Sequence, residues 1–279
     1  MAVSLSEREG RLRSVDGLQL YWRAWSPPAP KLTLAVTHGY FEHSGRYRAL
    51  AEGMAGFGVA TYAVDLRGHG QSEGARGHVD RWSQWVDDVG TFVDFVGDES
   101  AVEVVPLGHS VGGAVLLSAV LAGRVKPRRL VACSPALRPA LPVPAVKAGA
   151  AVLLSRVLPR LALDAGLDPG GISRRPEVVT AYAEDPLVFR KMTARTYTEW
   201  VANREAVLRD AGRIGVPFLA SHGDADPIIA MAGTVELCER AAAARPELKI
   251  YPGARHEPHN DLGAEQVFAD LASWLERTS

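Results

Sequence analysis

The residue with the clearest chemical potential is Ser110, which lies in the stretch GHSVGG at 108–113. An apolar run at 102–107 precedes this stretch, and an uncharged, mostly apolar run at 113–122 follows it. The two runs predict a buried strand and a helix, joined by a sharp turn that pushes the serine side chain outward. Glycines two residues before and two after the serine leave room for such a turn. The pattern therefore predicts a nucleophilic serine, with a turn serine that caps a helix as the alternative.

A nucleophilic serine needs a base and a carboxylate that orients the base, and both are expected downstream of it. The run at 216–223 is apolar enough for a buried strand, and Asp224 and Asp226 follow it. A carboxylate at such a strand end can reach across the carboxyl edge of a parallel sheet. We favour Asp226, which precedes Pro-Ile-Ile, and keep Asp224 as the alternative. A helix cap or an Asx turn is the structural alternative for both.

The base is expected to be His256. A short strand at 248–251 leads into the loop PGARH at 252–256, and a loop of this kind can carry a catalytic base. His259, three residues later, is the competitor. A zinc site through His256 and His259 is disfavoured, because Pro258 prevents the helical spacing that such ligands use. We expect neither a metal nor a cofactor.

An oxyanion formed during attack by the serine needs hydrogen-bond donors. In this kind of site they are the amide after the nucleophile and one from an early strand-to-helix loop. An apolar strand at 32–37 runs into the loop at 38–47, so the expected donors are the amides of Tyr40 and Val111. The remaining histidines have no sequence argument for catalysis and are expected to be structural: His38, His43, His69, His78, His109 and His222.

Three long motifs carry a resemblance to a known family. They are HGYFEHSGRY at 38–47, DLRGHGQSEG at 65–74 and GHSVGG at 108–113, with shorter matches at 172–179, 185–188, 223–226 and 251–257. Together they closely resemble the monoacylglycerol lipase and lysophospholipase branch of the α/β-hydrolases, over nearly the whole chain. The resemblance implies a serine hydrolase with Ser110, Asp226 and His256 as the triad, and so favours Asp226 over Asp224.

The sequence departs from that family's pattern at two positions of the expected oxyanion hole. Val111 stands where many relatives carry methionine, which leaves the backbone amide in place. Tyr40 is bulkier than the residues common at its position, and it is expected to narrow the acyl or the alcohol side of the pocket.

Strand-like and helical segments alternate along the chain, which predicts a mostly parallel sheet flanked by helices. Strands are expected at 18–25, 32–37, 59–64, 102–107, 129–133, 216–223 and 248–251, and helices at 46–57, 82–96 and 113–122. The first two strands are expected to form a hairpin. With the resemblance, the expected fold is α/β, of the α/β-hydrolase type.

The alternation stops after residue 135 and resumes near 216, which predicts a helical cap inserted before the strand that carries Asp226. We place the hydrolase core at 1–136 and 212–279 and the cap, or lid, at 137–211. Within the cap, 145–163 is helix-like and apolar almost all round, so no single stripe defines its buried face. Either this run covers the active site and offers an apolar face to acyl chains or a lipid surface, or it is buried against the core.

Composition narrows the function classes. A chain of 279 residues with 47% hydrophobic content is long enough for a large core, and its net charge of −1 gives no electrostatic footprint for nucleic acid. Its two cysteines make a disulfide framework improbable, and the first residues lack an apolar leader. We therefore expect a cytoplasmic protein, with peripheral contact to a membrane left open. The sequence gives no indication of oligomeric state.

The expected activity is hydrolysis of carboxylic esters of single-chain lipids, above all of monoacylglycerol to glycerol and fatty acid, through an acyl-enzyme. The same residues would also serve a short- or medium-chain carboxylesterase or a lysophospholipase, because one fold and triad support many substrates. A non-catalytic receptor for a lipid-like ligand is the remaining alternative.

Overall fold

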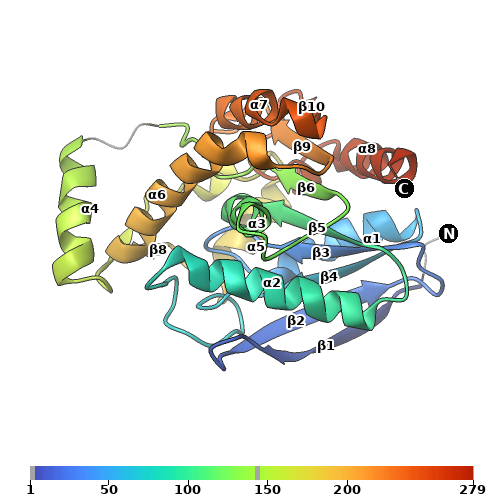
Figure 1. The fold of residues 1–279 in the computed structure, drawn as a ribbon, viewed down its shortest axis with the longest axis horizontal. Coiled ribbons are helices and arrows are strands. Elements are labelled where there is room, and N and C mark those ends of the chain that lie inside the picture. The colour runs from blue at the N-terminus through green and yellow to red at the C-terminus, as the bar shows by residue number, and fades with distance from the viewer. Residues whose placement is uncertain (1–3, 142–144, 279) are drawn as a thin grey trace.

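The main element of the computed structural model, which describes residues 4–141 and 145–278, is a twisted sheet (Figure 1). Within the described residues it has eight strands in the order β1-β2-β4-β3-β5-β6-β9-β10. Their bounds are β1 Ser6–Arg13, β2 Gln19–Ser26, β3 Leu32–Thr37, β4 Val59–Val64, β5 Val104–His109, β6 Leu130–Cys133, β9 Phe218–Gly223 and β10 Glu247–Tyr251. A small second sheet pairs β7, Ala162–Asp164, with β8, Lys191–Thr193.

From β4 to β10, neighbouring strands of the main sheet run parallel. All six residues of β4 and of β9 are buried, and β6 is buried throughout. Continuous apolar segments of this kind suit strands covered on both faces. The mostly parallel sheet flanked by helices confirms the predicted fold class.

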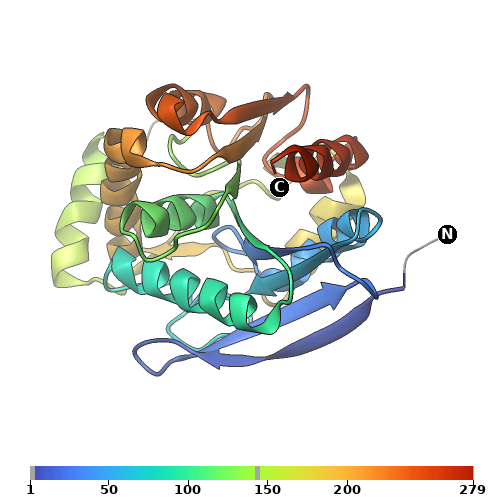
Figure 2. The ribbon, with the colours of Figure 1, turned by 45° about the vertical axis from the view of Figure 1, so that its right-hand side comes forward.

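The hairpin expected between 18–25 and 32–37 is wrong. Strand β2 instead forms a hairpin with β1 and pairs antiparallel with β4, while β3 lies on the other side of β4. Strand β1 was not predicted from the sequence, because its residues, SEREGRLR, are highly charged. They are also mostly exposed, as suits an edge strand. Figure 2 shows the hairpin of β1 and β2 as the outer edge of the sheet.

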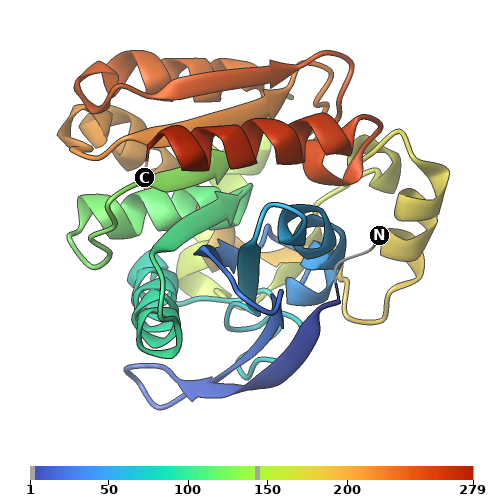
Figure 3. The same ribbon diagram turned by 90° about the vertical axis from the view of Figure 1, so that its right-hand side faces the viewer.

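Helices cover both faces of the sheet. Helix α1, Arg48–Ala55, and helix α8, Ala264–Arg277, lie on one side, and α2, Trp82–Glu99, and α3, Val111–Leu121, on the other (Figure 3). One buried cluster joins α2, α3 and the sheet around Trp85, Leu116 and Phe218. A second joins α1, α8 and the opposite face around Tyr47 and Trp274. Helix α7, Met231–Arg240, connects β9 to β10.

The described residues between β6 and β9 add three more α-helices: α4, Ala145–Val157, α5, Pro176–Glu184, and α6, Ala194–Asp210. Figure 1 shows α4 at the periphery of the molecule, beside α6. Much of its apolar surface is open to solvent: Val146 is 84% exposed and Leu153 is 64% exposed. A cap helix buried against the core is therefore the wrong alternative for these residues. The division into a core and a cap at 137–211 stays a prediction, and 142–144 within it lie outside the described residues.

Short 3₁₀ helices lie at Ser44–Tyr47, Pro169–Gly171, Ala211–Arg213, Ala242–Ala244 and Pro258–Asn260. Among the described residues, no helix is both long and apolar enough to cross a membrane.

Candidate active site

Ser110 occupies the turn between β5 and α3, with the positive backbone φ of 52° and ψ of −122°. Residues other than glycine rarely adopt such backbone angles, and here the surrounding structure holds Ser110 in them. The Ser110 amide donates to the carbonyl of Cys133 on the adjacent strand at 3.0 Å. A Cβ atom added to Gly112 would collide with the Thr37 and His38 carbonyls, and one on Gly108 would come within 2.6 Å of the Gly112 carbonyl oxygen. The two glycines are thus needed for close backbone packing, as the sequence pattern predicts.

The structure brings Ser110, His256 and Asp226 together in one hydrogen-bonded chain. The imidazole Nε2 of His256 lies 2.9 Å from Ser110 Oγ, and Nδ1 lies 2.7 Å from Asp226 Oδ2. Because the carboxylate can only accept, we assign the proton to Nδ1, which leaves Nε2 free to accept from the serine hydroxyl. Burial alone lowers the pKa of His256, but the charge and hydrogen bond of Asp226 outweigh it and raise that pKa above its ordinary value.

Asp226 is fixed on all sides. Its side chain is 1% exposed, and its Oδ1 accepts from the amides of Ile228 at 2.8 Å and Ile229 at 3.0 Å. His222 Nε2 lies 3.1 Å from Oδ2. Burial raises the pKa of Asp226, yet the charge of His256 and these hydrogen bonds hold it well below its ordinary value. Asp224 is exposed, and it instead accepts from the Gly253 amide at 2.6 Å.

The histidine against the serine hydroxyl is His256, whereas the competitor His259 stacks on the ring of Tyr47 at 5.3 Å. It also packs against His109, which in turn contacts His256. Burial lowers the pKa of His259 and of His109, which favours the neutral form of each imidazole. Sequence reasoning missed the contact of His222 with Asp226, since a histidine inside an apolar strand carries no signal of what it faces.

The expected oxyanion donors Tyr40 and Val111 line the same cavity as Ser110. The Val111 amide is the first of α3, so no helix carbonyl is available to it. His38 shapes the facing loop: its Nε2 accepts from the Leu66 amide at 2.9 Å, and its Nδ1 donates to the Gly39 carbonyl at 2.5 Å. These contacts hold the backbone that leads into Tyr40, and the part of the two amides in an oxyanion hole stays a prediction.

The ring of Tyr40 is packed against other aromatic side chains. Its ring packs in a cluster with Phe41, Trp85 and Phe189, and its hydroxyl donates to the Gly77 carbonyl. Burial raises the pKa of the Tyr40 hydroxyl. The ring belongs to this cluster while Tyr40 also lines the cavity, so the narrowing of the pocket expected from this side chain stays a prediction.

A cavity of about 690 Å³ opens above the serine. This volume is typical of small-molecule sites. Its floor holds Ser110 and His256, and its walls come from the loop after β3 and from the segment between β6 and β9. Most of the lining side chains on the latter segment and beside Asp226 are apolar: Leu141, Ala151, Leu163, Leu167, Met192, Trp200, Ile228 and Ile229.

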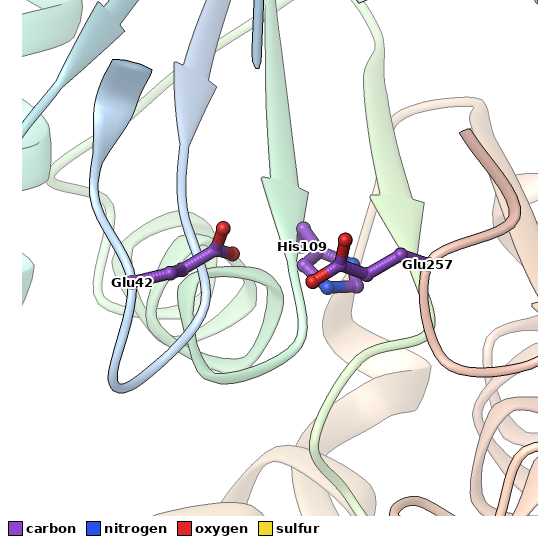
Figure 4. Close-up of side chains that lie close together, drawn as sticks. All are labelled: Glu42, His109 and Glu257. Atoms are coloured by element: carbon purple, nitrogen blue, oxygen red, sulfur yellow. The ribbon is translucent and has the colours of Figure 1, made fainter. Parts of the chain in front are cut away.

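Three residues that line the cavity, Glu42, His109 and Glu257, come from separate loops or strand ends, and their side chains lie close together (Figure 4). Their ligand atoms lie within 4.8 Å of one another, a spacing that a metal ion could use. Both carboxylates, however, are paired with the guanidinium of Arg46, at 2.6–2.7 Å. A cation already bridges both carboxylates, so we assign no metal to this cluster. Sequence reasoning missed the grouping of Glu42, Glu257 and Arg46.

A family model described as serine aminopeptidase, S33, matches residues 28–263. The chain is also 32% identical to a monoacylglycerol lipase of Mycolicibacterium smegmatis, over 98% of each chain. The chain belongs to the monoacylglycerol lipase-like α/β-hydrolases. It is 35% identical to human monoglyceride lipase, over 95% of this chain and 89% of that one. Among solved structures, a monoacylglycerol lipase from Paleococcus ferrophilus superposes with a TM-score of 0.81 at 30% identity, covering 99% and 100% of the two chains.

Membership of this family makes the protein a serine hydrolase of the lipase and esterase type. The family resemblance stated from the motifs is confirmed, and so is the hydrolase fold. The roles of the individual residues and the identity of the substrate are proposals, argued next.

Proposed function

We propose that this protein hydrolyses monoacylglycerols to glycerol and fatty acid through an acyl-enzyme on Ser110. The proposal rests on one observation: the hydrogen-bonded chain from Asp226 through His256 to Ser110 ends at the floor of an apolar cavity. A base in reach of a serine, itself oriented by a carboxylate, activates that serine as a nucleophile.

The first half-reaction forms the acyl-enzyme. Ser110 Oγ attacks the ester carbonyl carbon while His256 Nε2 takes the hydroxyl proton, and Asp226 stabilises the resulting imidazolium. The negative charge on the carbonyl oxygen is held by the amides of Tyr40 and Val111. As the intermediate collapses, the bond between carbonyl carbon and alcohol oxygen breaks, and His256 returns its proton to the departing glycerol.

The second half-reaction releases the fatty acid. A water molecule takes the place of the alcohol, gives a proton to His256 and attacks the acyl carbon. The ester bond to Ser110 then breaks, and the serine oxygen recovers the proton from His256. The enzyme is regenerated, and one ester and one water have become one alcohol and one acid.

The shape and chemistry of the cavity support a single-chain lipid ester as substrate. Apolar side chains from the segment between β6 and β9 suit an acyl chain. Relatives at 32% and 35% identity are themselves named monoacylglycerol and monoglyceride lipases. A volume of about 690 Å³ leaves little room for the three chains of a triacylglycerol.

We also propose that 137–211 acts as a cap whose outer apolar face contacts lipid surfaces. The exposed apolar side chains that support this proposal are Leu141, Val146, Val152, Leu153, Val157, Leu158, Leu161 and Leu163. Two of them, Leu141 and Leu163, also line the cavity. An apolar surface continuous with the mouth of the cavity would let a lipid ester enter without first crossing water.

The test is hydrolysis of p-nitrophenyl esters of two to sixteen carbons, of 1- and 2-monoacylglycerols, of lysophosphatidylcholine and of a triacylglycerol, with Ser110→Ala as the blank. Monoacylglycerols are expected to be preferred, and Ser110→Ala is expected to remove nearly all turnover while keeping its circular dichroism spectrum. Confinement to short esters would make the protein a general carboxylesterase, and preference for lysophosphatidylcholine a lysophospholipase. Silence on every ester, with tight binding of a lipid, would point to the receptor alternative.

A further inference from the structure

The buried ion pairs of Arg46 with Glu42 and Glu257 link the two loops that carry the proposed chemistry. We propose that Glu257 is a positioning residue, which acts through Arg46 to hold the loop of the oxyanion hole and the loop of the catalytic base in one arrangement. This inference rests on the proposed function, since it assigns Glu257 a part in the same acyl transfer. Glu257 itself is not required to touch the reacting atoms.

The guanidinium of Arg46 bridges the carboxylates of Glu42 and Glu257. Its Nη1 lies 2.6 Å from Glu257 Oε1 and its Nη2 lies 2.7 Å from Glu257 Oε2, a bidentate pair. The same Nη1 lies 2.7 Å from Glu42 Oε2. The guanidinium is 9% exposed and lies 4.6 Å from the ring centre of Tyr182. Bidentate, charge-assisted pairs of this kind fix geometry as well as adding energy.

Each end of this bridge is attached to a loop of the site. Glu42 Oε1 accepts from the Gly39 amide at 2.7 Å, and Gly39 directly precedes Tyr40, the expected oxyanion donor. Glu257 directly follows His256, and its amide donates to the Ile172 carbonyl at 2.9 Å. Glu42 and Glu257 are far apart in the sequence, and Arg46 holds their loops in register across the cavity floor.

The bridge also has an electrostatic consequence for His256. Two carboxylates share one guanidinium, which leaves an excess negative charge beside the base. The groups that face His256 or its partners are Asp226 and His222 from β9 and its loop, Glu42 and Arg46 from the loop after β3, His109 from β5, and Glu257 and His259 from its own loop. His109 and His259 have lowered pKa values through burial, so neither compensates the excess charge.

This charge favours the imidazolium that forms when His256 accepts the serine proton. Burial opposes that cation, while Asp226, then Glu257 and Glu42, act to raise the pKa of His256. Removal of the Glu257 charge therefore lowers the pKa of His256, and the acid limb of the pH profile moves to lower pH. A change that only loosens the loop lowers the rate without moving that limb in this direction.

The test compares Glu257→Gln with Glu265→Gln and Arg46→Lys. Glu265 is exposed in the first turn of α8, so Glu265→Gln removes the same charge away from the site. The readouts are kcat and KM on the best ester, and the rate of labelling of Ser110 by a fluorophosphonate, each against pH. A fluorophosphonate carries no glycerol, so a slower labelling rate cannot come from a lost alcohol contact.

We expect Glu257→Gln to lower kcat and the labelling rate by about ten- to a hundredfold, as small misplacements of reacting groups do. KM should change little, and the acid limb should move down by about half a pH unit or more. Arg46→Lys keeps the cation but loses the fork, so it should lower the rate as well. Glu265→Gln should match the wild type. A Glu257→Gln variant with a wild-type acid limb, or with a labelling rate within about twofold of wild type, overturns the proposal.

If Glu257→Gln fails to fold by circular dichroism, Glu42→Gln tests the bridge from its other end. The same fall in labelling rate is expected, and a wild-type rate overturns the proposal. The labelling assay also separates this inference from the proposed substrate. A wild type that is labelled but cleaves no monoacylglycerol refutes the substrate alone, whereas a wild type that is never labelled refutes the proposed function and this inference with it.

Discussion

The two aspartates after β9 offer a sharp test of the proposed chemistry. They are only two residues apart in the sequence, but their surroundings differ. Asp226 is buried against His256 and His222, whereas Asp224 is exposed and its carboxylate accepts from the Gly253 amide. Changing each to asparagine removes one negative charge and almost no volume. The pair Asp226→Asn and Asp224→Asn therefore isolates the role of the carboxylate that contacts the base.

The expected loss follows from the geometry. Asp226 Oδ2 lies 2.7 Å from His256 Nδ1, so the charges of carboxylate and imidazolium are close and shielded from water. Unit charges about 4 Å apart interact with about 4 kcal/mol at an effective dielectric constant of about 20. At about 1.4 kcal/mol for each factor of ten, loss of this attraction lowers kcat about a thousandfold. An asparagine amide also favours the wrong tautomer of His256, which raises the expected loss toward about 10⁴-fold.

The assay is the steady-state rate on the best ester found in the substrate series, with both variants checked for folding by thermal unfolding. Asp224→Asn should stay within about threefold of wild type, because exposed substitutions change free energies by about 0.5 kcal/mol. A loss of less than tenfold for Asp226→Asn, or a larger loss for Asp224→Asn, would refute the assignment of the orienting carboxylate.

Three further predictions concern the elbow, the base and the cap. Gly112→Ala should lower the free energy of unfolding by about 2 kcal/mol or more, since its methyl group meets the Thr37 and His38 carbonyls; urea denaturation measures this, and an unchanged midpoint would contradict it. The kcat/KM of the wild type should rise as the pH passes through the raised pKa of His256, because only the neutral imidazole accepts the serine proton. Asp226→Asn should lower that pKa and so move the acid limb of the pH profile to lower pH. Leu153→Asp on α4 should weaken hydrolysis of long-chain esters more than of short ones, and equal losses on both would sink the role of the cap surface.

The sequence was most informative where local pattern and chemistry coincide. The strand, the glycine-flanked serine and the uncharged helix predicted the turn at Ser110, and the order Ser, Asp, His along the chain predicted which side chains meet. These predictions work because each depends on a few neighbouring residues or on the order of parallel strands at one sheet edge.

The pairing of distant charges could not be predicted in this way. Arg46 and Glu257 are 211 positions apart, and each alone looks like an ordinary solvated charge. Likewise, the edge strand β1 has no apolar alternation in its sequence. Its side chains are mostly exposed, and it is held in the sheet by its pairing with β2. Both features depend on packing between elements, which one sequence does not record.

The connection from β6 to β9 has a consequence for how such enzymes can diverge. These strands are parallel neighbours, so the chain must travel back from the end of β6 at Cys133 to the start of β9 at Phe218. Helix α6 returns the chain to the other end of the sheet and packs on α3 and α2, as a crossover helix does. The stretch ahead of α6, which walls much of the cavity, is extra to the connection. This segment can therefore vary in sequence and length, and with it the substrate preference, while the strands that position the catalytic residues stay the same.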